Sequence, residues 1–226
     1  MTLEVNMPSR IGGADGDNGS APTLDVSTLP PSALDYRSPI WWGNALLLCI
    51  ETTMFALAVA TYFYLRRNYH QWPPPLTDIS PPVYFPLPDL KWSTINLFVL
   101  LVSVIPMIIS DRACLRGAEK TVKWAALSGA VLAIVSIYLR FKEFPGLMFR
   151  WDANAYASTI WTILGLHLLH LIVLTIEDGL MTAYVFVHGL DDKHARDIRV
   201  TAVYWYWVVA TWVILYAVVY LVPRMM

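Results

Sequence analysis

Residues 41–67 read WWGNALLLCIETTMFALAVATYFYLRR, and this stretch decides the fold class. A run of apolar and aromatic residues lies between two tryptophans and two arginines, and it contains a single acid, Glu51. About 20 such residues span the roughly 30 Å of bilayer hydrocarbon as a helix. Lipid cannot hydrogen-bond a free backbone, so the segment has to be helical. The stretch predicts a transmembrane helix with a carboxylic acid near its centre.

The composition of the whole chain agrees with a polytopic membrane protein. Of its 226 residues, 57% are hydrophobic and 15% are charged, and the mean hydropathy is +0.50. Soluble domains average about 45–50% apolar and about 25% charged residues. The formal net charge is −1, so no basic field favours a nucleic-acid partner.

Four further segments are long and apolar enough to cross the bilayer. With the first, the expected spans are Ile40–Leu65, Trp92–Ile109, Val122–Leu139, Ala155–Val187 and Val203–Val222. We therefore expect an all-α fold, with a five-helix transmembrane domain over residues 39–226. Residues 1–38 are rich in Gly, Pro, Ser, Thr and Asp and hold no apolar run, which predicts a disordered cytoplasmic tail.

The connections between these spans suggest their environment and the orientation of the chain. Gln71–Pro88 contains seven prolines and is expected to lie extended on the surface. Residues 139–154 are amphipathic and are expected to lie in the membrane interface. Nine of the 16 Lys and Arg residues fall on the N-terminal side of the spans, which favours a cytoplasmic N-terminus and an outside C-terminus.

Glu51 is the clearest candidate for a functional residue, because an ionisable group inside a spanning helix costs about 2.5–3.5 kcal/mol on insertion scales. Asn44, Glu51 and Ala58 recur at seven-residue spacing, so they share one helix face that should point into the protein. Two readings are open. Glu51 either supports the chemistry of the protein, or it only hydrogen-bonds a neighbouring helix.

The fourth span carries a second polar stripe. His167 and His170 lie one turn apart, and Glu177 returns to the face of His170, with Asp178 beside it. A di-iron bundle needs Glu-x-x-His on two helices, which this chain lacks. The two cysteines, Cys49 and Cys114, have no metal-binding spacing. The preferred reading is that the histidines hydrogen-bond across helices or to lipid headgroups.

Several motifs, in order, resemble subunit III of haem-copper oxidases of the cytochrome c oxidase type. WWGNALLLCIETTMF places Glu51 on the intramembrane glutamate of that family, and RFKEF places Glu143 on a second acid, with Arg140 in place of the family's Gln. YASTIWTILGLHLLHL supplies His167 and His170, and YWYWVVATW resembles the last motif of the family. The glutamate motif lies on the first span here, which resembles a five-helix form of the family.

The sequence also departs from the family pattern. Tyr206 stands where the family has His, and Val209 stands where it has Asp, so the polar contact between those two is missing. Glu177 and Asp178 are acids at positions where the family is usually apolar.

The resemblance implies a non-catalytic subunit of a respiratory terminal oxidase in a bacterial-type inner membrane. It would bind no haem or copper, pack beside subunit I with subunit II nearby, and hold phospholipid in a cleft. The five histidines are fewer than the ligands that a haem-copper centre needs, and no paired-cysteine copper loop occurs. The residues expected to support structure and proton uptake are Glu51, Asn44, Glu143, His167, His170 and Glu177. The candidates for lipid binding are Trp42, Trp161, His167 and His170.

Two alternatives stay open at this point. The accessory subunit of a nitric oxide reductase shares the same fold. A channel or transporter could use Glu51 and the stripe from His167 to Glu177 as a relay, although transporters usually show an internal repeat, and none is visible here. The electron donor of the complex cannot be deduced from this chain.

Overall fold

The computed structural model describes residues 39–76, 82–84 and 86–225, with the side chains of 192 and 193 excepted. Five helices in this part are long and apolar enough to cross a membrane, which confirms the predicted class. The expected tail over residues 1–38 lies outside the described residues. The helices are α1 (Pro39–Arg66), α2 (Leu90–Leu115), α3 (Glu119–Glu143), α4 (Ala155–His188) and α5 (Asp192–Tyr216). A 3₁₀ turn, η1 (Phe144–Leu147), extends α3, and a π-helical turn, η2 (Ala217–Leu221), joins α5 to α6 (Val222–Met225).

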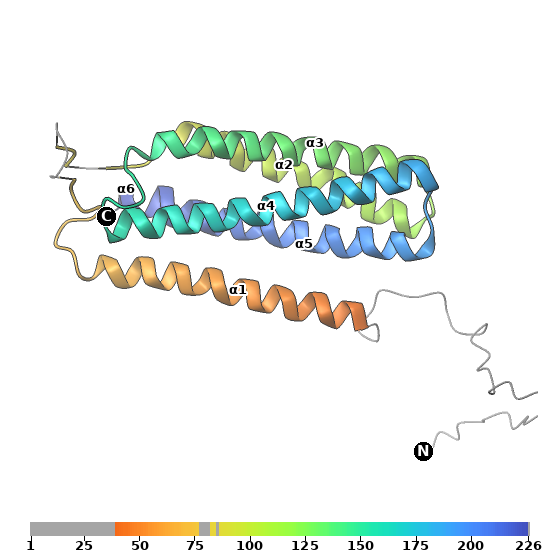
Figure 1. The fold of residues 1–226 in the computed structure, drawn as a ribbon, viewed down its shortest axis with the longest axis horizontal. Helices are drawn as coiled ribbons and strands as arrows, with labels where there is room; N and C mark the ends of the chain where they lie inside the picture. Colours follow the sequence, from red (N-terminus) through yellow and green to blue (C-terminus); the bar gives the residue numbers. More distant parts are fainter. Residues whose placement is uncertain (1–38, 77–81, 85, 226) are drawn as a thin grey trace, which may run out of the picture. The chain divides into compact units, whose positions relative to one another are not determined.

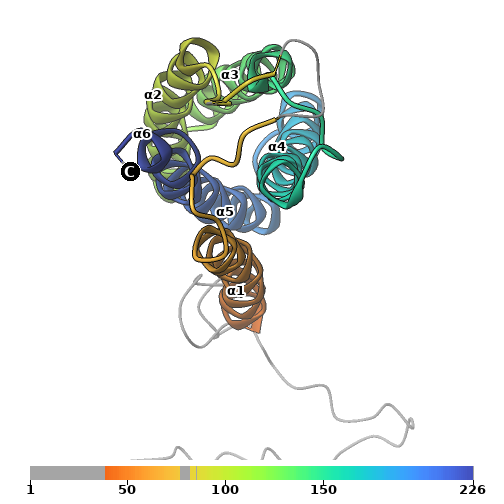
Figure 2. The same cartoon turned by 90° about the vertical axis from the view of Figure 1, so that its left-hand side faces the viewer.

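Helices α2 to α5 form a four-helix bundle, and α1 packs beside it against α4 and α5 (Figures 1 and 2). The tightest pairing is between α2 and α3, where one face of α3 is lined with small residues. These buried small residues are Ala125, Ala126, Gly129, Ala130 and Ala133. A Cβ atom added at Gly129 would lie 3.4 Å from the sulfur of Met107. Small side chains let membrane helices approach closely, so they determine how α2 and α3 pack.

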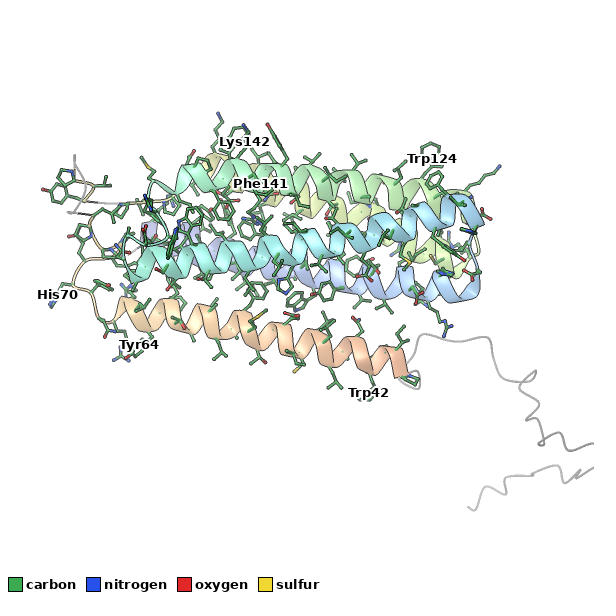
Figure 3. The ribbon with its side chains drawn as sticks, in the orientation of Figure 1. Trp42, Tyr64, His70, Trp124, Phe141 and Lys142 are labelled. Atoms are coloured by element: carbon green, nitrogen blue, oxygen red, sulfur yellow. The ribbon has the colours of Figure 1, made fainter. Side chains whose placement is uncertain are left out.

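The first helix is the least buried of the five. Its buried residues are Phe55 and Tyr62, both in its C-terminal half, and none of its residues from Pro39 to Met54 is buried. Helices α1 and α4 diverge toward the N-terminal end of α1 (Figure 1). Trp42 and Tyr64, near the two ends of α1, both point away from the bundle (Figure 3). Helix α1 therefore contacts the bundle through one face and leaves the rest of its surface for lipid or for other proteins.

Three predicted spans are shorter than the helices that contain them, and the second was expected to end at Ile109 whereas α2 continues to Leu115. The third span does not end at Leu139, because α3 continues through Arg140 to Glu143, whose opposite charges are paired inside the bundle. The fifth helix begins at Asp192, well before Val203, because the side chain of Asp191 caps it by accepting a hydrogen bond from the backbone N–H of His194. Charged sequence had been interpreted as loop in all three places.

The proline-rich connection after α1 also differs from expectation. It was expected on the surface, but Pro73, Pro74 and Leu76 are buried, and Leu76 forms an antiparallel bridge with Val83. The indole N–H of Trp72 donates a hydrogen bond to the hydroxyl of Tyr62 (2.9 Å). The described part of this connection crosses the end of the bundle (Figure 2) and helps to close it.

Candidate functional site

A charged network lies in the interior of the bundle, where the C-terminal ends of α3 and α5 pack near α4. The guanidinium of Arg140 donates to the carboxylate of Glu143, with 2.7 Å between Nη1 and Oε2. The hydroxyl of Tyr220 donates to the other oxygen of Glu143. Arg140 and Tyr220 are fully buried and Glu143 is 2% exposed. The pair is therefore isolated from water, and each charge depends on the other for its stabilisation.

The face of the Arg140 guanidinium lies on Trp212, with 3.6 Å between Cζ and the ring centroid. A desolvated guanidinium gains about 2 kcal/mol or more from such a cation–π contact. Trp212 also contacts His167, with ring centroids 4.9 Å apart. Helix α5 thus contributes Trp212, and η2 contributes Tyr220, to a charge that is carried on α3.

His167 joins this network as a neutral ring of defined tautomer. Its Nδ1 lies 3.1 Å from Nη2 of Arg140, and its Nε2 lies 3.2 Å from the backbone oxygen of Val208. A guanidinium can only donate, so Nδ1 accepts. A carbonyl oxygen can only accept, so Nε2 carries the proton. These hydrogen bonds satisfy both ring nitrogens within the protein, and the side chain is 1% exposed.

Glu51 has a defined partner, His170 of α4. The distance between Oε2 of Glu51 and Nε2 of His170 is 2.8 Å, and Nδ1 of His170 donates to the backbone oxygen of Leu166 at 2.7 Å. Because Nδ1 carries a proton, one further proton is shared between Nε2 and the carboxyl. The pair is either a neutral acid donating to a neutral imidazole, or an imidazolium donating to a carboxylate. The shared proton can therefore move between Glu51 and His170 with little change in geometry.

The two clusters are neighbours, because His167 and His170 lie one turn apart on α4. The ring of Phe55 from α1 packs near both histidine rings, with centroid distances of 6.4 Å to His167 and 5.2 Å to His170. The indole N–H of Trp207 donates to the hydroxyl of Thr52 at 2.8 Å, which adds a second polar contact between α1 and the bundle. The site consists of a fully buried charged cluster and a half-buried acid–histidine pair at its edge.

Two other predicted residues, Glu177 of α4 and Asn44 of α1, lie toward the end of the molecule where α1 begins, and both are less buried than the charged network. Glu177 is exposed, and it accepts a hydrogen bond from the hydroxyl of Thr201 on α5 at 2.9 Å. Asn44 is half-buried on α1, one heptad before Glu51. The neighbouring Asp178 is buried, and within the described residues its Oδ2 has no hydrogen-bond partner.

The four candidates for lipid binding do not lie together: two are buried and two are at the surface or beside a surface hollow. His167 and His170 lie inside the bundle with their ring nitrogens bonded, whereas Trp42 is exposed on α1. Trp161 lines a surface hollow of about 780 Å³ at the end of α3 and the start of α4, with Phe144 against its ring and its N–H bonded to the carbonyl of Phe149. A lipid-binding role for these four residues stays a prediction.

The sequence reasoning missed Arg140, Trp212 and Tyr220 as functional residues. The available signal was the spacing Arg140-x-x-Glu143, which places opposite charges one helical turn apart at the end of an apolar run. It was read as the start of an interfacial loop. Trp212 and Tyr220 gave no such signal, because an aromatic residue in a spanning helix is ordinarily a packing residue. Val209, which stands where the family has Asp, is 3% exposed and lies in the apolar core.

The described residues contain no group of three or more His, Cys, Asp or Glu side chains placed to hold a metal ion. Their fold and site define a class: a polytopic helical membrane protein whose interior carries paired charges. A sequence model of the family "Cytochrome c oxidase subunit III" matches residues 36–223, and the chain belongs to this family. It is thus a subunit III of an oxidase complex that includes other subunits.

Individual relatives agree with this assignment. The chain is 27% identical over 188 residues to cytochrome c oxidase subunit 3 of Thermostichus vulcanus, covering 80% of this chain and 87% of the relative. It is 25% identical over 183 residues to the subunit 3 of Candida parapsilosis and 26% identical over 181 residues to that of Neurospora crassa. These matches cover 79% and 77% of this chain, and 65% of each fungal relative.

The buried ion pair gives a direct test of the network. Arg140→Met leaves Glu143 buried without its partner and should lower the free energy of unfolding by about 3–5 kcal/mol. The double variant Arg140→Met, Glu143→Gln should lose less than this, because no unpaired charge remains. The measurement is denaturant-induced unfolding of the purified protein in detergent.

The exposed pair of Arg150 and Asp152 provides the matched control, because their side chains are 81% and 44% exposed. Arg150→Met should cost less than about 1 kcal/mol. A single variant at position 140 that is no less stable than the double variant would show that the pair does not stabilise the interior.

Proposed function

We propose that this chain packs beside the catalytic subunit of its oxidase, supports assembly, and keeps proton uptake fast during oxygen reduction. The observation that carries the proposal is the hydrogen bond between Glu51 and His170, which holds an exchangeable proton beside the buried cluster of Arg140, Glu143 and His167. Haem and copper would be held by the partner subunits I and II. In this chain, charge and proton positions are fixed by hydrogen bonds between helices.

The rigidity of the buried cluster supports this role. The side chains of the cluster are nearly or fully inaccessible to water, namely Arg140, Glu143 and Tyr220. Breaking their hydrogen bonds would leave buried polar groups unpaired, so a rearrangement has a high free-energy cost. His170 is on the same helix as His167 and is held by the carbonyl of Leu166. A proton on the Glu51–His170 pair therefore sits in a fixed electrostatic environment. Such a pair suits a supporting role in proton supply better than a packing role, which an apolar contact would fill at lower cost.

The same proposal includes bound phospholipid and a fixed orientation. The hollow beside Trp161 is lined by Phe141, Phe144, Met148 and other apolar side chains, with the ion pair of Arg150 and Asp152 at its edge, and its apolar lining suits an acyl chain. The membrane would be a bacterial-type inner membrane, with the N-terminus in the cytoplasm and the C-terminus outside. The α2–α3 turn, which carries Arg116, Lys120 and Lys123 nearby, would then face the cytoplasm.

The partner arrangement predicts how the protein purifies. The chain should co-purify from membranes with a haem-bearing subunit through packing between helices. Expressed without its partners, the folded chain should show no Soret absorption and no bound copper. Haem or copper in a one-to-one ratio with the isolated chain would contradict the supporting role.

The variant Glu51→Gln tests proton supply. An amide keeps the shape of the side chain and can still hydrogen-bond His170, so the oxidase should assemble with normal haem content. Because the amide cannot carry the exchangeable proton, steady-state oxygen consumption should fall, with the deficit largest at high pH where protons are scarce. The measurement is oxygen uptake against pH in the intact complex.

Thr53→Val is a suitable control on the same helix, since the Thr53 hydroxyl only donates to the backbone oxygen of Cys49. Its oxygen-uptake curve should match that of the unsubstituted complex. If the Glu51→Gln curve also overlaid it at every pH, Glu51 would be a packing residue and the proposed role in proton supply would fail.

A further inference from the structure

Glu177 is an acid on a surface that otherwise suits lipid. Along α4, Val173, Ile176, Glu177 and Leu180 are exposed, at the spacing that places them on one side of a helix. The three apolar members are 56%, 57% and 66% exposed in chain order. An ionisable side chain facing hydrocarbon is costly, and such groups usually face a partner or a cavity. The exposure of Glu177 therefore needs an explanation beyond the fold of this chain.

The depth of Glu177 can be read from the helix packed beside it. Oδ2 of the next residue, Asp178, lies 3.8 Å from the position of a Cβ atom on Gly129 of α3. Gly129 follows Lys123 by six residues, which is about 9 Å along a helix. Lys123 and the exposed Trp124, which points outward in Figure 3, are residue types that mark the membrane interface. Glu177 is thus about 9 Å deeper than the headgroup level.

Within the described residues, one of the two carboxylate oxygens of Glu177 accepts a hydrogen bond. Its Oε1 accepts from Thr201, whereas Oε2 receives no hydrogen bond or ion pair from the described residues. It shares a side of α4 with His170, which pairs with α1, but α1 has diverged from α4 at this level and offers no buried residue there. One carboxylate oxygen and the surface around it are available to another molecule.

We propose that the surface formed by Val173, Ile176, Glu177 and Leu180 of α4 receives a transmembrane helix of another oxidase subunit, which places a cationic side chain against Glu177. The charge of the acid selects a cation, and the apolar neighbours select a helix rather than a water-filled passage. A lipid fits less well, because an acyl chain carries no hydrogen-bond donor and a headgroup lies about 9 Å too shallow. This inference rests on the proposed function, since it names one surface by which the chain joins its complex.

Photo-crosslinking within the assembled complex tests the proposal. Leu180→p-benzoylphenylalanine places a reactive group one helical turn from Glu177, in the full-length chain expressed with its partner subunits. Irradiation of membranes should yield an adduct between this chain and another oxidase subunit. A lipid adduct only, or no adduct, from a chain that still co-purifies with haem-bearing subunits would overturn the inference and leave the proposed function intact.

A second substitution tests the acid itself. Combined with the crosslinker, Glu177→Gln should lower the yield of the subunit adduct by about three- to tenfold, the range expected for hydrogen bonds between membrane helices. Glu119→Gln removes an acid at the start of α3, where it pairs with Lys123, and should leave the yield unchanged. An equal yield for Glu177→Gln and Glu119→Gln would refute the ion pair. Failure of the unsubstituted chain to co-purify with any subunit would overturn both proposals.

Discussion

The ion pair between Arg140 and Glu143 is the interaction on which the rest of the interior depends. Two charges removed from water are stable only when hydrogen bonds and ring contacts complete their surroundings. Tyr220 supplies a hydroxyl to Glu143, His167 accepts from Arg140, and Trp212 covers the guanidinium. These partners come from α4, α5 and the π-helical turn, so the pair specifies how three segments meet. Hydrophobic contacts alone would not select one arrangement among similar helices in lipid.

Helix α1 joins this interior in a different way. Near its middle, Glu51 hydrogen-bonds His170 and Thr52 accepts a hydrogen bond from Trp207. Near its C-terminal end, the hydroxyl of Tyr62 accepts a hydrogen bond from Trp72. Its N-terminal half has no buried residue. The acid–histidine pair is therefore also a principal polar contact between α1 and the bundle. A change in its protonation would alter both the charge beside the buried cluster and the strength of that contact.

Much of the fold could be predicted from the sequence, and the site only in part. Five apolar runs are enough to predict five spans, because the length of a hydrocarbon crossing is fixed. The position of Glu51 inside one of them identified it as a candidate. Its partner could not be predicted, because the heptad spacing of α4 offers His170 and Glu177 on one face and does not say which lies at the level of Glu51. Arg140 was missed because a charged residue at the end of an apolar run looks the same whether it faces water or a buried acid.

If the Glu51–His170 pair supports proton supply as proposed, its hydrogen bonding or protonation should change as the oxidase turns over. Infrared difference spectroscopy of the intact oxidase, recorded between its oxidised and reduced states, measures this directly. We expect a carboxyl band that shifts on reduction and disappears in the Glu51→Gln variant, with haem content unchanged. Identical difference spectra for the unsubstituted complex and the variant would show that the pair is insensitive to turnover and would contradict the proposed role.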